Sequence, residues 1–491
     1  MSLTRAAHRV LMASFAGPGS GTERRLPEWV RRAVDDGLGA LALFADNVVG
    51  EEGAAPLTLD AHRGRAGIIV AMDEEGGDVT RLHHRSGSTR VGAGVLGRID
   101  DVESTRSTAE RIGADLYEQG VDLALAPVAD VGSDPRNPVI GARSFGGDPV
   151  LVARHVTAWV EGVQRAGVGA CLKHFPGHGD TTIDSHVGVA RVRADAGLLD
   201  RRDFTPFRAG IRAGVHAVMG SHVVVEAIDP LRVATYSPEA TRLLRAAPSA
   251  GGLGFDGALL TDALDMAGAR GAGDIPARAV SALAAGADLM CLGARIDEST
   301  FVRTVEGLER AVRTGAVPAE RLEEAAERVD ALSARLGRLR DVRRAPVVGA
   351  RTDELLAARA ITVDGELPSL RDAVVVQFVG PHHGAVGTVA GWGLPTEGRV
   401  LAGRTPALVG EGDPLPETAG RPVVVLVRNS VRSPWMRDRV RRLARRARPV
   451  VVVEFGAPDP DLPAPTTYIC TWGASRAVAA PLDTLLADAA R

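Results

Sequence analysis

Apolar and polar positions along the first two-thirds of the chain alternate between short strand-like stretches and longer segments of helical period. Eight stretches rich in β-branched or small apolar side chains fit buried strands, at residues 10–16, 40–44, 67–72, 123–128, 168–173, 217–225, 258–261 and 287–292. Helical periodicity is clearest over residues 27–36, 102–118 and 150–166. Eight strand–helix units within roughly 300 residues predict a (β/α)8, TIM-like barrel. The alternative is an open doubly wound sheet, but no GxGxxG motif follows the first strand.

A second α/β pattern follows this barrel. A charged helix over residues 318–342 ends the first part, and residues 345–349 are typical of a linker. Further strands are expected at residues 373–378, 422–427, 450–455 and 466–470, with a basic helix over 434–447. The predicted α/β architecture is therefore a barrel domain over residues 1–343 and a smaller αβα sandwich over 344–491.

Composition narrows the class of protein. Apolar residues make up 45% of the chain and charged residues 24%, and the net charge is −3, which favours neither nucleic acid nor an acidic membrane as the main partner. Three distant cysteines cannot form a disulfide framework, and no apolar stretch reaches the ~20 residues that cross a bilayer. We interpret residues 10–16 as a strand rather than a signal peptide and expect a cytoplasmic protein. The sequence predicts no oligomeric state.

Candidate chemistry gathers where the predicted strands end, which is where barrel enzymes carry their active sites. Asp73 follows the third strand, with Arg81 a little further on, and the loop after the fourth strand contains Arg143. The fifth strand ends at Lys173, the only Lys among 58 basic residues, and the seventh ends at Asp262. Side chains from at least four strand ends are therefore expected to converge on one rim.

The densest segment covers residues 173–186, where three His, two Asp and the only Lys lie among Gly and Pro. Two chemistries compete for it. A zinc site could use His174, His178, Asp180 and His186, but no HExxH spacing is present and the Lys ammonium would repel a divalent cation. In acid–base chemistry, Asp184 would fix the tautomer of His186 and raise its basicity. We favour the second and expect neither a metal nor a cofactor.

Asp262 is the natural nucleophile, because a carboxylate at the end of a very apolar strand is partly desolvated and points into the barrel mouth. A carboxylate nucleophile with a separate proton donor is what double displacement at an anomeric carbon requires.

These motifs resemble those of family 3 glycoside hydrolases of the NagZ type, which act as β-N-acetylglucosaminidases. The signature is Lys173-His-Phe-Pro-Gly-His-Gly-Asp-Thr181 followed by Asp184-Ser-His186. Supporting matches occur in family order at residues 43–47, 73–81, 137–146, 253–255, 261–266 and 286–289. The resemblance covers about residues 10–340. The second domain resembles the family's accessory domain in pattern only.

The resemblance implies a role for each matching residue. Asp262 would be the nucleophile, His186 the general acid/base and Asp184 its partner. Five residues would bind the sugar: Asp73, Arg81, Arg143, Lys173 and His174. The implied activity is that of a retaining exo-β-N-acetylglucosaminidase acting on small glycosides such as cell-wall turnover fragments.

The sequence departs from the family pattern at residues 74, 78, 226–229 and 233–237, and four alternative functions remain open. Glu74 and Asp78 replace the family's usual Gln and Arg, and their acidity is expected to disfavour anionic sugars. The nearest alternative is a glycoside phosphorylase, since a neutral His acid/base would admit phosphate. A glycosidase using an accessory-domain carboxylate such as Glu454, a metal-dependent hydrolase and a non-catalytic sugar-binding protein are the others.

Overall fold

The computed structural model describes residues 1–491 except 22–23, 51–52, 184–187, 342–351, 381–391, 404, 448, 463–466 and 491. Its contacts divide the chain into two units. The barrel unit comprises Met1–Glu75, Thr105–Val131 and Asp148–Val348, and the accessory unit comprises Gly76–Ser104, Gly132–Gly147 and Gly349–Arg491. The linker predicted at 345–349 lies outside the described residues. Two segments of the N-terminal half therefore group with the C-terminal part of the chain.

The barrel unit is built on an eight-stranded parallel sheet in the order β11-β9-β7-β6-β3-β2-β1-β12. A parallel bridge between Leu260 and Leu289 joins its two ends. The strands are β1 (Leu11–Ala13), β2 (Ala40–Leu43), β3 (Ile69–Met72), β6 (Leu123–Ala124), β7 (Gly169–Phe175), β9 (Ala217–Gly220), β11 (Ala258–Thr261) and β12 (Met290–Cys291).

All eight predicted barrel strands are confirmed, including the N-terminal stretch interpreted as a strand. The sixth predicted strand, residues 217–225, forms two strands in the structure. After β9 it continues as β10 (Val223–Val225), which pairs with β8 (Ala190–Val192) in a separate two-stranded sheet. The short β4 (Glu74–Gly76) and β5 (Val79–Thr80) follow β3.

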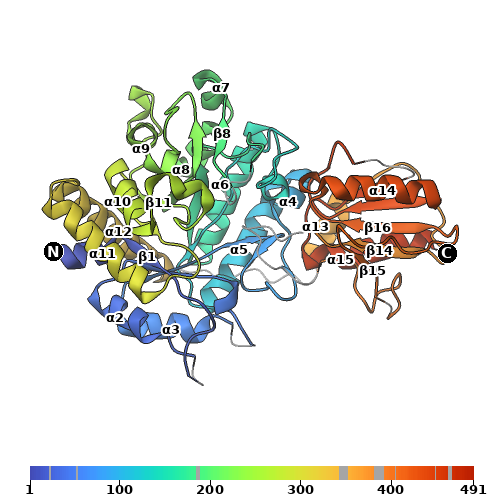
Figure 1. Ribbon diagram of the computed structural model, residues 1–491, viewed down its shortest axis with the longest axis horizontal. Helices are drawn as coiled ribbons and strands as arrows, with labels where there is room; N and C mark the ends of the chain where they lie inside the picture. The colour runs from blue at the N-terminus through green and yellow to red at the C-terminus, as the bar shows by residue number, and fades with distance from the viewer. Residues whose placement is uncertain are drawn as a thin grey trace. The chain divides into compact units, whose positions relative to one another are not determined.

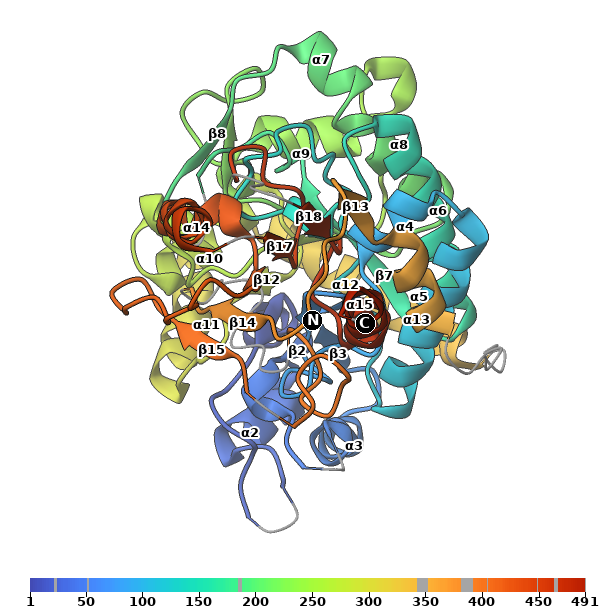
Figure 2. The same ribbon diagram turned by 90° about the vertical axis from the view of Figure 1, so that its right-hand side faces the viewer.

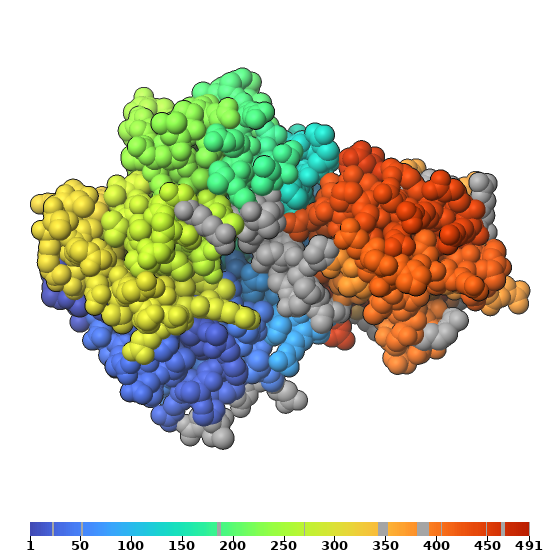
Figure 3. Space-filling view, viewed as in Figure 1, coloured from blue at the N-terminus to red at the C-terminus, as the bar shows by residue number. Residues whose placement is uncertain are grey.

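Helices follow the strands and surround them (Figure 1). They are α1 (Leu3–Arg9), α2 (Glu28–Asp36), α3 (Ala55–Gly64), α5 (Val102–Glu118), α6 (Pro149–Arg165), α7 (Ala196–Arg201), α8 (Phe204–Arg212), α9 (Pro238–Arg245), α10 (Ile275–Ala285), α11 (Glu298–Arg313) and α12 (Ala319–Asp341). Asp148, Asp274 and Asp297 cap α6, α10 and α11 by accepting backbone N–H groups. In the space-filling view, the green and yellow segments from α7 to α12 form one outer face of this unit (Figure 3). In the described part of the chain, no helix is both long and apolar enough to cross a bilayer.

The barrel interior is packed with side chains from alternate strand positions, as strand geometry requires. Ala40 and Ala42 of β2, and Ala217 and Met219 of β9, are examples of these inward pairs. The long helix α12 contributes three buried apolar residues to the same cluster, Val329, Leu332 and Leu336. The strands and this helix therefore share one core.

The accessory unit contains a six-stranded sheet in the order β13-β18-β17-β16-β14-β15, parallel except for β13. Its strands are β13 (Thr362–Asp364), β14 (Val374–Phe378), β15 (Ala407–Val409), β16 (Val423–Val427), β17 (Val450–Glu454) and β18 (Thr467–Cys470). Helix α14 (Pro434–Arg446) lies on one face, and α13 (Thr352–Ala360) and α15 (Arg476–Ala489) lie on the other (Figure 2). The four predicted strands and the basic helix are confirmed. The sequence did not predict β13 and β15, which have three residues each and are partly exposed.

Candidate active site

Strand alternation places three of the candidate residues in one layer above the barrel core. Asp73, Lys173 and Asp262 each lie two positions beyond an inward-facing core residue of β3, β7 and β11. The Cys171 thiol beneath them reports their proximity: burial raises its pKa, and the charges of Lys173, Asp73 and Asp262 all act on it. The alternation therefore brings two carboxylates and an ammonium together in the barrel unit.

Lys173 is buried and paired with two carboxylates. Its Nζ lies 2.8 Å from Asp73 Oδ1 and 2.7 Å from Glu75 Oε1, and its side chain is 3% exposed. A compact ammonium with three rotatable donors suits this position better than a planar guanidinium does. Asp73 keeps part of its side chain accessible, so the pair can still meet a ligand.

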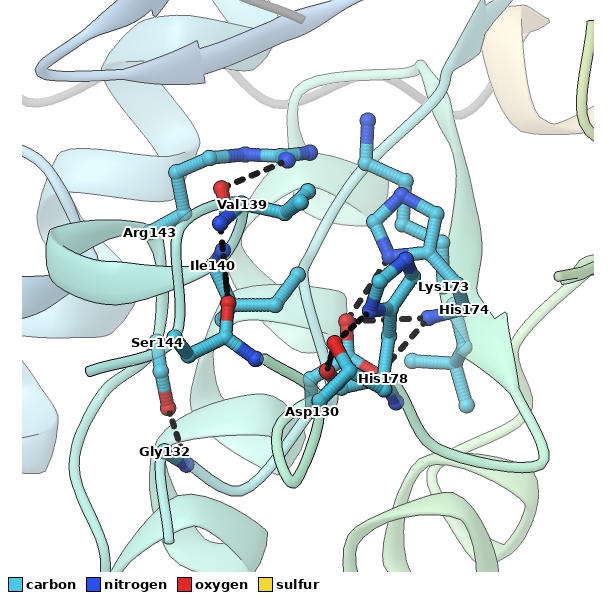
Figure 4. A network of polar contacts seen from close by, with 12 residues as sticks. Asp130, Gly132, Val139, Ile140, Arg143, Ser144, Lys173, His174 and His178 are labelled. Atoms are coloured by element: carbon cyan, nitrogen blue, oxygen red, sulfur yellow. Dashed lines mark hydrogen bonds and ion pairs between the residues drawn. The ribbon is translucent and has the colours of Figure 1, made fainter. Parts of the chain in front are cut away.

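Asp130 holds the segment that carries His174 and His178, which we call the histidine loop, although Asp130 was not among the predicted site residues. Its carboxylate accepts the backbone N–H of His174 (3.2 Å) and of His178 (2.7 Å), and its Oδ2 lies 2.7 Å from His174 Nδ1 (Figure 4). Burial alone would raise the pKa of Asp130, but the charge of His174 and these hydrogen bonds outweigh it and lower that pKa. An ionised Asp130 holds a proton on His174 Nδ1, which leaves Nε2 to meet a ligand.

His178 is neutral and fixed in one tautomer. Thr181 Oγ1 donates to the His178 carbonyl oxygen (3.0 Å) and therefore accepts from His178 Nδ1–H (2.8 Å). Burial lowers the pKa of His178 to about 4, so the ring carries no charge at pH 7. Its Nε2 is consequently a hydrogen-bond acceptor.

The far end of this loop is anchored to the start of α8. Asp180 Oδ2 accepts from Arg202 at 2.9 Å, and Arg202 Nε donates to Asp203 Oδ2 at 3.0 Å. Burial raises the pKa of Asp203 to about 6, against the opposing charge of Arg202. A Cβ at Gly179 would lie 1.7 Å from the carbonyl oxygen of Val131, so the loop passes where only glycine fits.

Asp262 follows β11 as a half-buried carboxylate. Its backbone N–H donates to the Gly220 carbonyl at 3.1 Å, and its Oδ1 accepts the Ala263 N–H at 2.8 Å. The fully buried His222 has Nε2 2.9 Å from the Ala263 carbonyl oxygen, so Nε2 carries a proton, because a carbonyl only accepts. Backbone and side-chain contacts thus fix the peptide that follows the carboxylate.

The other candidate residues fall into two groups. Arg81 and Arg143 are buried in the accessory unit, and Arg143, at the end of η2 (Gly141–Arg143), donates from Nη1 to the Val139 carbonyl at 3.4 Å (Figure 4). Asp184 and His186, the predicted acid/base pair, lie outside the described residues.

Three of the four residues considered as zinc ligands already interact with other side chains. His174 and His178 direct Nδ1 at Asp130 and Thr181, and Asp180 is paired with an arginine. Among the described residues, no three His, Cys, Asp or Glu side chains are arranged to hold a metal ion.

Glu454, the accessory-domain alternative, is 0% exposed. Its carboxylate accepts the N–H groups of Asn429 (2.6 Å) and Ser430 (3.1 Å) and also contacts the Ser430 hydroxyl. An acid/base must reach the substrate, and this buried side chain is engaged within its own unit.

Sequence reasoning left three contributors out of the candidate set: Glu75, Asp130 and His222. Each follows a barrel strand and could be found as a polar residue there, but only the fold shows which partner each one meets. Asp78, expected to repel anions, is buried, and its Oδ1 accepts the Ala474 N–H at 2.6 Å. The Asp78 carboxylate therefore interacts within the accessory unit and is not exposed to solvent.

Comparison with known proteins identifies a family and several similar proteins. The model of the glycosyl hydrolase family 3 N-terminal domain matches residues 21–332. A β-hexosaminidase A of Pseudoalteromonas piscicida is 30% identical over 380 residues, which are 70% of this chain but only 62% of that protein. A β-hexosaminidase of Stenotrophomonas maltophilia (strain K279a) is 34% identical over 325 residues, 63% of this chain and 90% of that protein. A solved family 3 β-N-acetylglucosaminidase from Paenibacillus sp. str. FPU-7 matches with a TM-score of 0.84 and 28% identity, over 100% of this chain and 97% of that one.

Proposed function

The chain belongs to glycoside hydrolase family 3, and we propose that it is a retaining exo-β-N-acetylglucosaminidase that releases terminal β-linked GlcNAc from small glycosides. The observation that carries the proposal is the half-buried carboxylate of Asp262, which lies in the same layer as the Asp73–Lys173 pair. The β-hexosaminidase and β-N-acetylglucosaminidase relatives support the choice of sugar.

Catalysis would proceed by double displacement. The Asp262 carboxylate attacks the anomeric carbon, and His186 gives its proton to the leaving oxygen, so a covalent glycosyl-enzyme forms. His186 then takes a proton from water, which attacks the same carbon and frees Asp262 with overall retention of configuration. In this proposal Asp184 would accept a hydrogen bond from the other imidazole nitrogen and stabilise the charged ring.

The remaining side chains would bind the sugar. The Lys173 ammonium can donate to a sugar hydroxyl, while the accessible part of Asp73 can accept from one. His174, oriented by Asp130, presents Nε2 to a hydroxyl or the acetamido group. Arg81 and Arg143 supply further donors, and none of these steps calls for a metal.

Substitution of the nucleophile tests the mechanism. Asp262→Asn should abolish turnover of aryl β-GlcNAc, because an amide cannot displace the aglycone. Asp297→Asn is the matched control, since Asn also caps helix α11. His186→Ala should slow turnover strongly, but less for substrates with activated leaving groups. Wild-type rates in Asp262→Asn would refute the assignment of the nucleophile.

A substrate panel tests the activity itself. Aryl β-glycosides that differ only at the second carbon of the sugar should be hydrolysed with a strong preference for the acetamido form. Each assay is repeated with phosphate. Faster turnover that yields a sugar 1-phosphate would establish a phosphorylase instead, and binding without turnover would establish a sugar-binding protein.

The natural substrate is a further part of this proposal. We propose that the enzyme acts in the cytoplasm on GlcNAc-containing fragments from cell-wall turnover. Fractionation of producing cells tests the location, and incubation with purified wall fragments tests the substrate. Release of GlcNAc from simple aryl glycosides but not from such fragments would refute this part alone.

A further inference from the structure

Two segments with proposed sugar-binding arginines belong to the accessory unit rather than to the barrel unit. Gly76–Ser104 follows β3 and carries Arg81, and Gly132–Gly147 follows β6 and carries Arg143. Loops after barrel strands usually pack on the barrel rim. Here their contacts group them with the C-terminal sheet.

Asp78 makes the first connection, three residues before Arg81. Its Oδ1 accepts the Ala474 N–H at 2.6 Å and lies 3.9 Å from Arg428 Nη2, and its side chain is 5% exposed. Ala474 lies in the loop between β18 and α15, and Arg428 directly follows β16. A buried hydrogen bond to a charged acceptor is stronger than a neutral one, so this contact fixes the turn before Arg81.

Asp353 makes the second connection, from the first turn of α13. Its Oδ1 accepts the Val91 N–H at 3.1 Å, and its Oδ2 lies 3.6 Å from Arg90 Nη1. The carbonyl of Ser88 accepts the Arg476 N–H at 2.7 Å, at the start of α15. The segment is therefore attached to both helices on one face of the accessory sheet.

Helix α4 (Ala93–Ile99) makes the third connection and extends it to the second segment. The guanidinium of Arg98 lies 5.5 Å from the ring centre of Trp472. A Cβ at Gly94 would lie 2.6 Å from the Trp472 carbonyl oxygen, and one at Gly97 would lie 1.6 Å from the Phe145 carbonyl oxygen. The close approach at Gly97 ties α4 to the backbone two residues beyond Arg143.

The second segment also meets the loops that follow β16 and β17. Asn137 and Arg143 line the same narrow hollow as Asn429, Arg432 and Ala457. The Asn137 carboxamide oxygen accepts two backbone N–H groups of its own segment, which gives the turn before Arg143 a fixed shape. Both segments thus contact loops or helices of the accessory unit.

From these contacts we infer that the accessory unit positions the two sugar-binding segments, and that Asp78 and Asp353 are positioning residues acting through Arg81. The inference rests on the proposed sugar-binding role of Arg81. Asp78 and Asp353 would then affect sugar affinity through Arg81 alone, without supplying a group that takes part in the chemistry.

Steady-state kinetics of the full chain test the functional half of the inference. Asp78→Ala and Asp353→Ala should each raise KM for aryl β-GlcNAc about tenfold while kcat changes less than about twofold, because lost positioning weakens binding without removing a reacting group. Asp78→Asn keeps an oxygen that can accept the Ala474 N–H and should restore a KM near that of the wild type. Asp438→Ala, an exposed carboxylate on α14, is the matched control and should change neither constant.

A double-mutant cycle separates positioning from general damage. If Asp78 acts through Arg81, adding Asp78→Ala to Arg81→Ala should raise KM little further. Fully additive effects, or an Asp78→Asn variant as impaired as Asp78→Ala, would overturn the inference.

Hydrogen exchange tests the structural half without reference to any substrate. In Asp78→Ala and Asp353→Ala, amide exchange should accelerate over residues 76–92 while strands β3 and β7 keep their protection. Unchanged exchange over 76–92 would overturn the inference even if KM rises. A wild-type chain that cleaves no β-GlcNAc would refute the proposed function instead, and the exchange result would still decide whether the accessory unit holds these segments.

Discussion

The buried Glu454 makes the stability of the accessory unit depend on pH in a way that a single substitution should remove. Burial raises the pKa of Glu454 to about 7, against hydrogen bonds from Ser430 and Asn429 that lower it. The Ser430 hydroxyl lies between Glu454 and Asp459, 2.8 Å from Asp459 Oδ2, and has one proton to donate. Arg437 pairs with both Asp459 oxygens at 2.9 Å, so Glu454 is the carboxyl that takes up the extra proton.

The magnitude follows from the difference between the folded and unfolded states. An unfolded chain releases the Glu454 proton near its ordinary pKa of 4.5, whereas the folded chain holds it until about pH 7. Between these values the folded state binds more protons at Glu454, so the contribution of Glu454 to stability is greatest below pH 4.5 and falls as the pH rises to 7. At ~1.4 kcal/mol per pKa unit, this contribution reaches about 3 kcal/mol.

The assay is denaturant unfolding of the full chain from pH 4.5 to 8, with Glu454→Gln compared with wild type. The Gln variant cannot titrate, so the free-energy difference between the two proteins should change by about 3 kcal/mol across this range. The exposed Glu417→Gln is the matched control and should parallel wild type. Parallel curves for Glu454→Gln would refute the assigned protonation. Because Glu454 is not the proposed acid/base, the Gln variant should also keep its kcat, and loss of activity in a folded variant would revive that alternative.

Three further substitutions test the barrel unit. Lys173→Met removes the ammonium from two buried ion pairs and should lower the free energy of unfolding by about 3–5 kcal/mol, measured by denaturant titration; a loss below about 1 kcal/mol would contradict the burial of these ion pairs. Leu332→Ala opens a cavity where α12 meets the barrel core and should cost about 2–5 kcal/mol in the same assay, whereas an unchanged midpoint would contradict that packing. Gly179→Ala places a methyl group against the Val131 carbonyl, so the histidine loop must shift; kcat/KM for aryl β-GlcNAc should fall at least tenfold, and an unaffected variant would show that the loop geometry is irrelevant to turnover.

The contacts of Asp78 explain differently why the sequence has Asp where the family usually has Arg. An acidic residue in place of the family's usual Arg suggested a repulsive charge beside the substrate. In the structure this carboxylate accepts the N–H of Ala474, in the loop between β18 and α15. The departure from the family motif thus serves to join two parts of one unit.

The sequence by itself determined the strands and the rim on which the chemistry gathers. Buried parallel strands must be apolar over several successive residues, so all eight barrel strands and four accessory strands were visible in the pattern. Alternation along β3, β7 and β11 then fixes Asp73, Lys173 and Asp262 on the inward side. These features are local, because they depend only on residues one to four positions apart in the chain.

Only the tertiary structure decided which charges meet. The pairing of Lys173 with Glu75, the Asp130 contacts to the histidine loop and the link from Asp78 to Ala474 join residues tens to hundreds of positions apart. The short edge strands β13 and β15 were likewise invisible, since three partly exposed residues form a strand only when a neighbouring strand offers hydrogen bonds. A local pattern along the chain cannot predict such contacts. The distances between these groups are set only when the strands of the barrel and of the accessory sheet have paired.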